Sequence, residues 1–230
     1  SRYYPFLKDR MGFLHNGSNM ERFDVSVPFE PYRFIWSSSP DRGLPYLLRL
    51  WPKIREILPK AELHCFYGWE NIDRAIRLGH RNLLEVRGEI EPLLKQDGVH
   101  WQGRVNQPRL AKEFLQSTVW LYPSRFLEVF CISAVEAMAA NLHIIASRCG
   151  ALPEVVGDKG TLLTDIAGGD PYQKTLLALL AHLPLERKVE PPSAGRAALF
   201  TWEKSAELWM KEYGTATEQG LRLVRERVEA

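Results

Sequence analysis

Two glutamates stand eight positions apart near the middle of the chain, where a strand gives way to a helix. The β-branching and alternation of Thr118 to Tyr122 predict a buried strand, and the Ala and Met spacing from about Phe130 to Ala140 predicts a helix. Glu128 falls in the short loop between them, and Glu136 falls within the helix. This junction is the segment of the sequence most suited to chemistry.

A helix that begins directly after a strand and a short loop presents unpaired backbone N–H groups. The groups near Phe130, Cys131 and Ile132, together with the helix dipole, suit a phosphate or pyrophosphate. Glu136 has apolar neighbours, so if it is buried its carboxylate needs hydrogen-bond donors, which sugar hydroxyls would supply. A nucleotide that carries a sugar therefore fits better than phosphate alone. The alternative is that Glu136 lies on a solvated helix face and Glu128 is an ordinary loop carboxylate near a helix start.

Short apolar strands alternate with helical stretches along the chain, which predicts an α/β fold. The expected architecture is a Rossmann-like, doubly wound parallel sheet with helices on both faces, and ligands beyond the carboxyl ends of the strands. The predicted strands are Arg33 to Ser37, Glu62 to Tyr67, Val99 to Gln102, Thr118 to Tyr122, His143 to Ser147 and Thr161 to Leu163. The predicted helices are Leu44 to Leu58, Asn71 to Gly79, Leu83 to Gln96, Gln107 to Gln116, Phe130 to Ala140, Pro171 to Leu183, and one from about Trp202 onward.

Composition limits the class of protein and its setting. The chain has 230 residues, 45% of them hydrophobic, and a formal net charge of +2 with no basic block, which disfavours a nucleic-acid partner. Its three cysteines lack metal-ligand spacing, and their odd number argues against a disulfide framework, so we expect a reducing cytoplasmic setting. No apolar run approaches the roughly 20 residues that a membrane span needs. Attachment to the inner face of a membrane stays open.

A series of short motifs follows one another in a familiar order. They are His15 to Phe23, Ser38 to Leu44, Gly103 to Val105, Pro123 to Ser124, Glu128, Glu136 to Ala139, Ala146 to Ser147 and Gly150 to Glu154. In this order the chain resembles the C-terminal, donor-binding half of a retaining glycosyltransferase of the two-Rossmann-domain (GT-B) type, in the group 1 or glycogen-synthase-like superfamily. One such motif would be weak, whereas the ordered series is specific.

The resemblance implies roles for individual residues. Glu136 would hold the ribose hydroxyls of a nucleotide sugar, and Glu128 would contact the donor sugar and organise the site around its anomeric carbon. Arg42 stands where the family has a basic residue that neutralises the diphosphate, and a guanidinium can bond phosphate oxygens in a fork. Arg104 would lie near the base, where it either stacks or is exposed.

The chain departs from the family pattern at glycine positions. Val129 and Cys131 stand where glycines commonly follow the first glutamate, and Asn141 replaces another common glycine. Side chains at 129 and 131 would narrow the approach of the backbone to a diphosphate.

A second departure concerns charge. The family has a second basic residue about five positions before Arg42, where this chain has Ser37. A serine can donate a hydrogen bond to the nucleotide sugar but cannot neutralise the charge of its diphosphate. Either Arg125 or Arg148 compensates, or the diphosphate is held less tightly.

The resemblance also implies a division of the chain. Residues 1–32 would be an interdomain linker or N-terminal extension, residues 33–187 the nucleotide-sugar-binding domain, and residues 188–230 a linker and a C-terminal helix. That helix would pack on an N-terminal acceptor domain ahead of the linker, and would expose apolar surface around Trp202 and Trp209 without it.

The favoured function is transfer of a sugar from a nucleotide diphosphate sugar to a glycan or glycoconjugate acceptor, as in polysaccharide biosynthesis, without a metal or other cofactor. This segment alone is expected to be inactive. The alternatives are a non-catalytic nucleotide-binding scaffold of the same fold, and a sugar-nucleotide epimerase or a phosphorylase. A nicotinamide-dependent oxidoreductase is least favoured, because no Gly-x-Gly-x-x-Gly run follows the first strand.

Overall fold

The computed structural model describes residues 13–164, 170–186, 188 and 193–214. Their contacts divide the chain into two compact units. The larger spans Met20–Ala198, and the smaller combines the described residues up to Asn19 with those from Leu199 onward. The segment 33–187 that the sequence predicts as the donor-binding domain falls within the larger unit.

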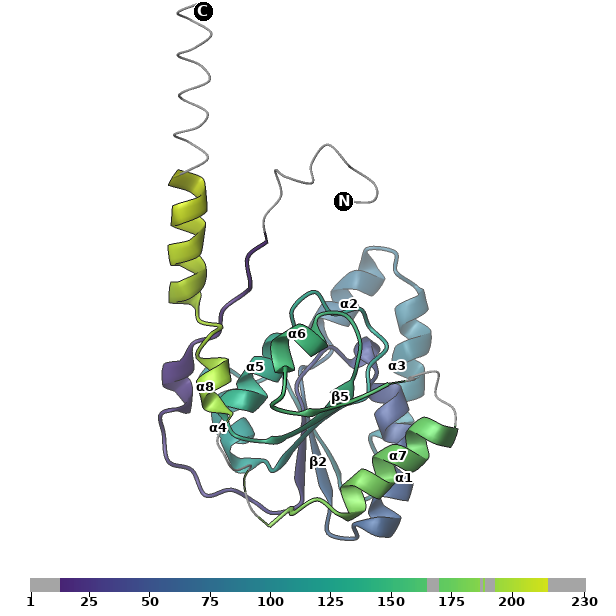
Figure 1. Ribbon diagram of the computed structural model, residues 1–230. Helices are drawn as coiled ribbons and strands as arrows, with labels where there is room; N and C mark the ends of the chain where they lie inside the picture. The colour runs from purple at the N-terminus through teal and green to yellow at the C-terminus, as the bar shows by residue number, and fades with distance from the viewer. Residues whose placement is uncertain (1–12, 165–169, 187, 189–192, 215–230) are drawn as a thin grey trace, which may run out of the picture. The chain divides into compact units, whose positions relative to one another are not determined.

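The larger unit is built on one six-stranded parallel sheet (Figure 1). The strand order is β3-β2-β1-β4-β5-β6, so the chain starts at the centre, runs to one edge and returns to build the other half. The strands are β1 (Arg33–Trp36), β2 (Glu62–Phe66), β3 (Val99–Gly103), β4 (Val119–Tyr122), β5 (His143–Ser147) and β6 (Thr161–Leu163). This is the doubly wound arrangement that the alternation of strands and helices predicts.

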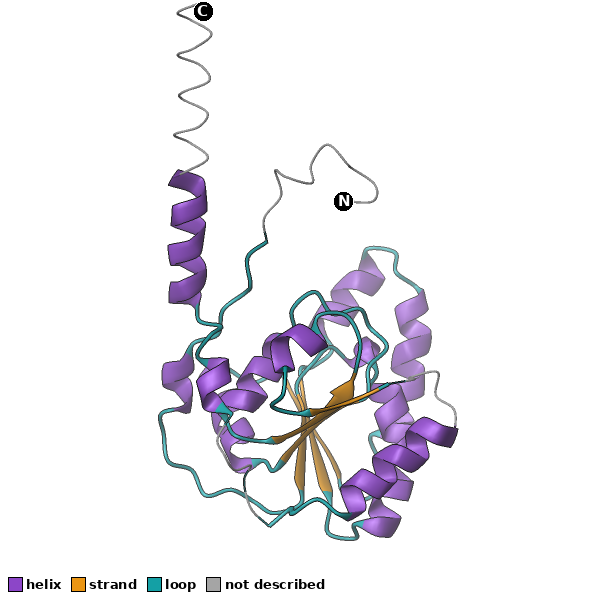
Figure 2. Cartoon of the chain, in the orientation of Figure 1, coloured by secondary structure: helices purple, strands orange, loops and turns teal. Residues whose placement is uncertain are grey.

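Helices cover both faces of this sheet, and Figure 2 shows the strands between two helical layers. One layer contains α1, α3 and α7, and the other contains α4, α5 and α8. The helices are α1 (Leu44–Ile57), α2 (Glu70–Arg77), α3 (Asn82–Leu93), α4 (Gln107–Gln116), α5 (Ile132–Ala139), α6 (Leu152–Val156), α7 (Asp170–Ala181) and α8 (Ala194–Ala197), with 3-10 turns η2 (Met20–Phe23) and η3 (Pro40–Arg42). Over the residues described, none of the helices has the length and apolar character to cross a membrane.

The core forms because the central strands are apolar on both faces. All four residues of β1 and all four of β4 are buried, as expected for parallel strands between two helical layers. Helix α1 turns a stripe of large apolar side chains toward them, and Trp51 meets Phe34 edge to face with ring centroids 5.6 Å apart. A proline at its first turn and Gly43 just before it mark where α1 begins.

The predicted elements are confirmed, with boundary shifts of up to three residues. The main correction concerns α5, which was expected from Phe130 and begins at Ile132. The short helices α6 and α8 were not predicted, because each has too few residues to show a helical period. The 3-10 turn η2 lies within the interval 1–32 that the sequence predicts as linker, and residues 187 and 189–192 of the second predicted linker lie outside the described residues.

Two of the glycine departures keep glycine-like backbone conformations. Cys131, which precedes α5, has φ 72°, and Asn141, which follows it, has φ 56°. Asparagine tolerates this left-handed region better than most residues. The Asn141 side chain also accepts hydrogen bonds from the backbone N–H groups of Ser193 (2.8 Å) and Ala194 (3.2 Å) at the start of α8. Asn141 therefore closes one helix and caps another, which a glycine could not do.

The smaller unit joins residues 13–19 to the segment from Leu199 onward. The N–H of Ser18 donates to the carbonyl of Phe200 at 2.9 Å, and Ser18 pairs with Thr201 in a parallel bridge. Residues 202–214 form a helix on which Trp202 and Trp209 are each about half exposed, at 49% and 50%. The exposed apolar surface expected at these two tryptophans is thus present.

The left-handed backbone conformation at Cys131 predicts how substitutions there change the stability of the fold. A Cβ in this region costs about 1–2 kcal/mol, and glycine avoids that cost. We therefore expect Cys131→Gly to be more stable than Cys131→Ala by about 1–2 kcal/mol in urea unfolding. At Lys112, an exposed position inside α4, the order should reverse, with Lys112→Ala more stable than Lys112→Gly by about 1 kcal/mol. Equal stability of the two Cys131 variants would contradict the strain.

Candidate functional site

The candidate site lies where the winding of the sheet changes direction. Strands β1 and β4 are neighbours at the centre, although the chain visits β2 and β3 between them. In open α/β sheets, ligands bind beyond the carboxyl ends of the strands at such a switch point. Two loops leave the sheet there, residues 37–43 after β1 and residues 123–131 after β4.

A buried carboxylate joins these two loops. The Glu128 side chain is 3% exposed, and the Arg42 guanidinium donates from Nη1 to its Oε2 at 3.1 Å and its Oε1 at 3.3 Å. The hydroxyl of Tyr122, the last residue of β4, donates to Glu128 Oε1 at 2.5 Å. Because that hydroxyl has given its hydrogen to Glu128, the Ser38 hydroxyl 3.2 Å away is the donor to Tyr122. The structure thus brings the predicted pair Glu128 and Arg42 into contact.

Burial keeps Tyr122 in its donor form. It raises the pKa of the phenol above its ordinary value, and Cys131 and the hydrogen bond to Glu128 raise it further. The phenol therefore stays protonated over the physiological range and serves as a fixed hydrogen-bond donor to the carboxylate.

Close backbone approaches hold the loops together. The Ser124 hydroxyl donates to the carbonyl of Arg42, and Gly43, at φ 121°, leaves only 3.1 Å between a would-be Cβ and the carbonyl oxygen of Pro123. Gly150 lies against the backbone of Glu128 so closely that a Cβ would fall 2.4 Å from its carbonyl oxygen. Gly150 is required by space and Gly43 by its positive φ, and the close contact at Gly150 fixes the position of the Glu128 backbone.

An aromatic ring contacts the arginine of this pair from its other side. The Arg42 guanidinium carbon lies 4.2 Å from the ring centroid of Phe126, which is a cation–π contact. The Arg42 side chain is nevertheless 38% exposed, so these contacts leave part of it open to solvent.

Glu136 is buried, which rules out the solvated-face alternative. Its side chain is 8% exposed on α5, and the nearest cation is Arg22, whose Nη2 lies 3.9 Å from Glu136 Oε1. Burial raises the pKa of Glu136 to about 7, and Arg22 lowers it in part. Near neutral pH, Glu136 is therefore partly protonated and partly ionised. Hydrogen bonds from hydroxyl groups would stabilise its ionised form.

The start of α5 is only partly as predicted. Phe130 and Cys131 are buried, Ile132 is 37% exposed, and the first hydrogen bond of the turn runs from the N–H of Ala134 to the carbonyl of Cys131. Val129 is 90% exposed, so its side chain points to solvent. Burial raises the pKa of the Cys131 thiol to about 12, which makes it a poor nucleophile.

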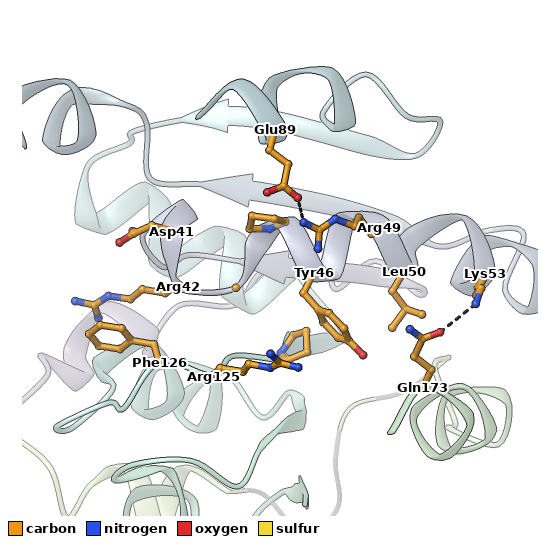
Figure 3. Close-up of a pocket in the computed structure, with 13 residues that line it drawn as sticks. Asp41, Arg42, Tyr46, Arg49, Leu50, Lys53, Glu89, Arg125, Phe126 and Gln173 are labelled. Carbon is orange, nitrogen blue, oxygen red and sulfur yellow. Dashed lines mark hydrogen bonds and ion pairs between the residues drawn. The ribbon is translucent and has the colours of Figure 1, made fainter. Parts of the chain in front are cut away.

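A cavity of about 730 Å³ lies beside the ion pair (Figure 3). Its walls come from the loop after β1, the first turns of α1 and the loop after β4, and they include Arg42, Arg125 and Phe126. Two other cations on its wall already have partners, since Arg49 pairs with Glu89 and Lys53 donates to Gln173 at 3.0 Å. Arg42 and Arg125 line the cavity from the loops after β1 and β4.

The remaining predicted residues are spread along the same edge of the sheet. Ser37 directly follows β1, and its hydroxyl is buried without a hydrogen-bond partner among the residues described. Arg104 follows β3, is exposed, and lies beside Gly68 in the loop after β2. Arg148 is exposed after β5 and, unlike Arg125, does not line the cavity. Of the two candidates to replace the missing basic residue, Arg125 therefore has the better position.

Three residues of this network were not predicted from the sequence: Tyr122, Ser38 and Arg22. The sequence pattern predicts Tyr122 as an apolar strand residue, and its position at the strand end is the signal that its hydroxyl can reach the loop. It predicts Ser38 in a phosphate loop without a specific partner. Arg22 falls in the predicted linker, so nothing in the sequence connects it with Glu136.

The arrangement can bind an anion and hydroxyl groups at one sheet edge. Arg42 and the first turn of α5 supply positive charge and donors, whereas Glu128 and Glu136 are acceptors. Glu128 already accepts from Arg42 and Tyr122, and Glu136 has spare acceptor capacity.

Comparison with known proteins identifies relatives over this region. Residues 34–167, more than half of the chain, match the family model described as glycosyl transferases group 1. The MMP alpha-(1->4)-mannosyltransferase of Mycolicibacterium hassiacum is 32% identical over 152 residues, which cover 63% of this chain and 37% of that protein. A D-inositol 3-phosphate glycosyltransferase of Arthrobacter is 30% identical over 116 residues, covering 50% of this chain and 27% of that protein. The chain thus spans less than half the length of these curated relatives.

Solved structures share the fold. The sucrose-phosphate synthase of Thermosynechococcus elongatus superposes with a TM-score of 0.66 at 20% identity, covering 95% of this chain and 57% of that one. Anabaena HepE in complex with UDP and glucose gives a TM-score of 0.62 at 15% identity, covering 89% of this chain and 56% of that one. At these identities the likeness concerns the fold.

The raised pKa of Glu136 predicts a pH-dependent stability. The folded state holds a proton up to about pH 7, whereas the unfolded chain releases it near 4.5, so stability falls as pH rises through this window. Glu136→Gln should remove that loss and increase the free energy of unfolding by about 3 kcal/mol at pH 8, with little gain at pH 4.5. Urea unfolding from pH 4.5 to 8 measures this, with Glu56→Gln, an exposed change on α1, as the control. An equal effect of Glu136→Gln at both pH values would contradict the burial of the charge.

Proposed function

Because the chain belongs to the group 1 glycosyl transferases, we propose that residues 33–187 bind a nucleotide diphosphate sugar as the donor for transfer to a glycan or glycoconjugate. The observation that carries the proposal is the contact of Arg42 with the buried Glu128 at the switch point, beside the start of α5. It places a half-exposed cation and a buried acceptor where this fold binds ligands. UDP in the complex of the neighbour HepE supports the ligand class.

In this proposal the diphosphate lies against Arg42 and the first turn of α5. The guanidinium can bond phosphate oxygens in a fork on its exposed side, and the helix dipole adds positive potential. Negative charge develops on the departing nucleotide as the sugar leaves, so these fixed donors stabilise the transition state more than the ground state. Arg125 lines the cavity beside Arg42 and would supply the charge that Ser37 lacks. The unpartnered Ser37 hydroxyl donates to a phosphate or sugar oxygen.

Glu128 has a positioning role at the sugar. Its carboxylate is held by Arg42 and Tyr122 and cannot rotate without leaving one of them unpaired. A carboxylate fixed beside the diphosphate site can accept a sugar hydroxyl and align the anomeric carbon.

Glu136 would bind the ribose. Two ribose hydroxyls can donate to its carboxylate and replace the hydrogen bonds that burial denies it. Because this favours the charged form, nucleotide binding near pH 7 would release a proton from Glu136. Arg104, exposed at the end of β3, would lie beside the base.

The rest of the reaction is proposed from the family resemblance. Transfer would retain the anomeric configuration and need no metal, and an acceptor-binding domain outside residues 1–230 would complete the cleft. The setting would be the cytoplasm or the inner face of a membrane. The anomeric configuration of the product made by the full-length protein, and its activity in EDTA, test these two points.

A second candidate is a nucleotide-binding domain without turnover. It is favoured by Ser37, which leaves one fewer cation than the family pattern, and by the side chain at Cys131. The full-length protein would then bind nucleotide and yield neither a glycoside nor free sugar from the donor.

The proposal predicts nucleotide binding by the chain itself. Calorimetric titration with UDP, GDP and ADP in EDTA should detect binding of one nucleotide, because phosphate contacts and ribose contacts lie within this unit. Arg42→Ala and Glu136→Ala should each weaken it at least tenfold, the loss expected from one charge-assisted hydrogen bond of about 1.5–3 kcal/mol.

Lys60→Ala is the matched control, since it removes one positive charge just before β2 at the opposite edge of the sheet. It should leave the affinity unchanged. Equal weakening by Lys60→Ala would indicate general charge attraction, and full affinity in both site variants would contradict the assignment of the site.

A further inference from the structure

A second cluster of polar side chains lies on the sheet away from the donor site. Glu62 and His64 are two residues apart on β2 and therefore project from the same face. His100 on β3 is the direct register partner of His64, so its side chain lies beside that of His64. Glu62 and His100 lie near the amino ends of their strands and His64 is the middle residue of β2, whereas the candidate donor site lies beyond the carboxyl ends of β1 and β4.

The ligand atoms of this cluster have the spacing of a metal site. Nε2 of His64 and Nε2 of His100 each lie 3.6 Å from Oε2 of Glu62, and each residue offers one ligand atom within 4.8 Å of the others. A zinc ion holds nitrogen and oxygen ligands at about 2.0–2.2 Å, which places tetrahedral ligand atoms about 3.3–3.6 Å apart. Small rotamer changes would complete that geometry. Among the residues described, this is the group whose His, Cys, Asp and Glu atoms converge in this way.

The imidazole nitrogens lack other partners. Both ring nitrogens of His64 and Nε2 of His100 are buried without a hydrogen bond among the described residues. A buried polar atom with no partner costs about 1–3 kcal/mol, and a bound ion would remove that cost. The two rings stack with centroids 4.6 Å apart and an interplanar angle of 30°.

Access for an ion exists on the solvent side. The His64 side chain is 11% exposed, whereas those of His100 and Glu62 are 41% and 52% exposed. An ion can therefore enter beside β3, the edge strand of the sheet, and keep water as its fourth ligand.

The charges around the cluster are compatible with a cation. Arg33 on β1 is the neighbouring positive charge, and it is already paired with Glu30 and Glu113. Glu62 contributes a carboxylate beside both imidazoles, which favours a cation between them. An unprotonated imidazole is the form that binds metals.

We propose that Glu62, His64 and His100 form a zinc-type divalent metal site that cross-links β2 to the edge strand β3. The carboxylate and two neutral imidazoles occupy three positions, and water occupies the fourth. Its role is structural, since the ion would hold the outermost strand of this half of the sheet in register. It is independent of the donor site.

The test is metal binding by the whole chain after dialysis against EDTA and then metal-free buffer. Titration with Zn²⁺ should give one bound ion per chain and raise the melting temperature. Co²⁺ should give the intense visible absorption bands of a tetrahedral complex, which an octahedral surface complex does not give. His64→Ala and His100→Ala should each weaken Zn²⁺ binding at least about 100-fold, because changes to the outer shell of metal sites alone cost 10–100-fold.

Two matched controls keep the result interpretable. His80→Ala and His182→Ala remove exposed histidines elsewhere and should leave Zn²⁺ affinity unchanged. Glu62→Gln keeps the size of a half-exposed side chain, so it should fold normally and still lose affinity. Absence of Zn²⁺ binding by the folded chain, octahedral Co²⁺ spectra, or equal affinity in Glu62→Gln and the unmodified chain would each overturn the proposal.

Discussion

The structure around the switch point depends on one constraint: the buried carboxylate of Glu128 must be paired with a positive charge and with hydrogen-bond donors. It sits in the loop after β4, 3% exposed, and its partners are Arg42 from the loop after β1 and Tyr122 from the end of β4. Removing one partner of a buried pair leaves an uncompensated charge at a cost of about 3–5 kcal/mol, and less here because Arg42 is 38% exposed. The requirement to satisfy Glu128 therefore fixes two loops that the sheet alone would leave independent.

Two features of the same region lower the stability of the folded state, and the rest of the fold offsets this loss. Glu136 is a carboxyl group buried in α5 with its nearest cation 3.9 Å away, and Cys131 holds a left-handed conformation with a Cβ. A large apolar core under α1 and the central strands supplies the stability that tolerates both. Such costs concentrate at functional sites, where a group prepared for a ligand is poorly satisfied without it. A ribose that donates to Glu136 would recover part of this cost on binding.

The sheet could be predicted from the sequence because its buried parallel strands are short apolar runs that lie between segments with the spacing of helices. The pair Glu128 and Arg42 could be predicted from motif order, although their direct contact could not. The start of α5 was placed two residues early, since composition does not reveal that Cys131 adopts φ 72°. Contacts between distant segments were beyond reach: Arg22 meets Glu136 from a turn read as linker, and His100 meets His64 only once the register of β2 and β3 is known.

The most direct test of the account is to map where the nucleotide binds. Backbone amide shifts of the ¹⁵N-labelled chain, followed as the tightest-binding nucleoside diphosphate is added, report the contact region residue by residue. The account predicts the largest changes in residues 37–43 and 124–136, on the two loops joined by Arg42 and Glu128 and along α5. Changes centred elsewhere, such as β2 and β3 near Glu62 and His100, or no changes at saturating nucleotide, would contradict it.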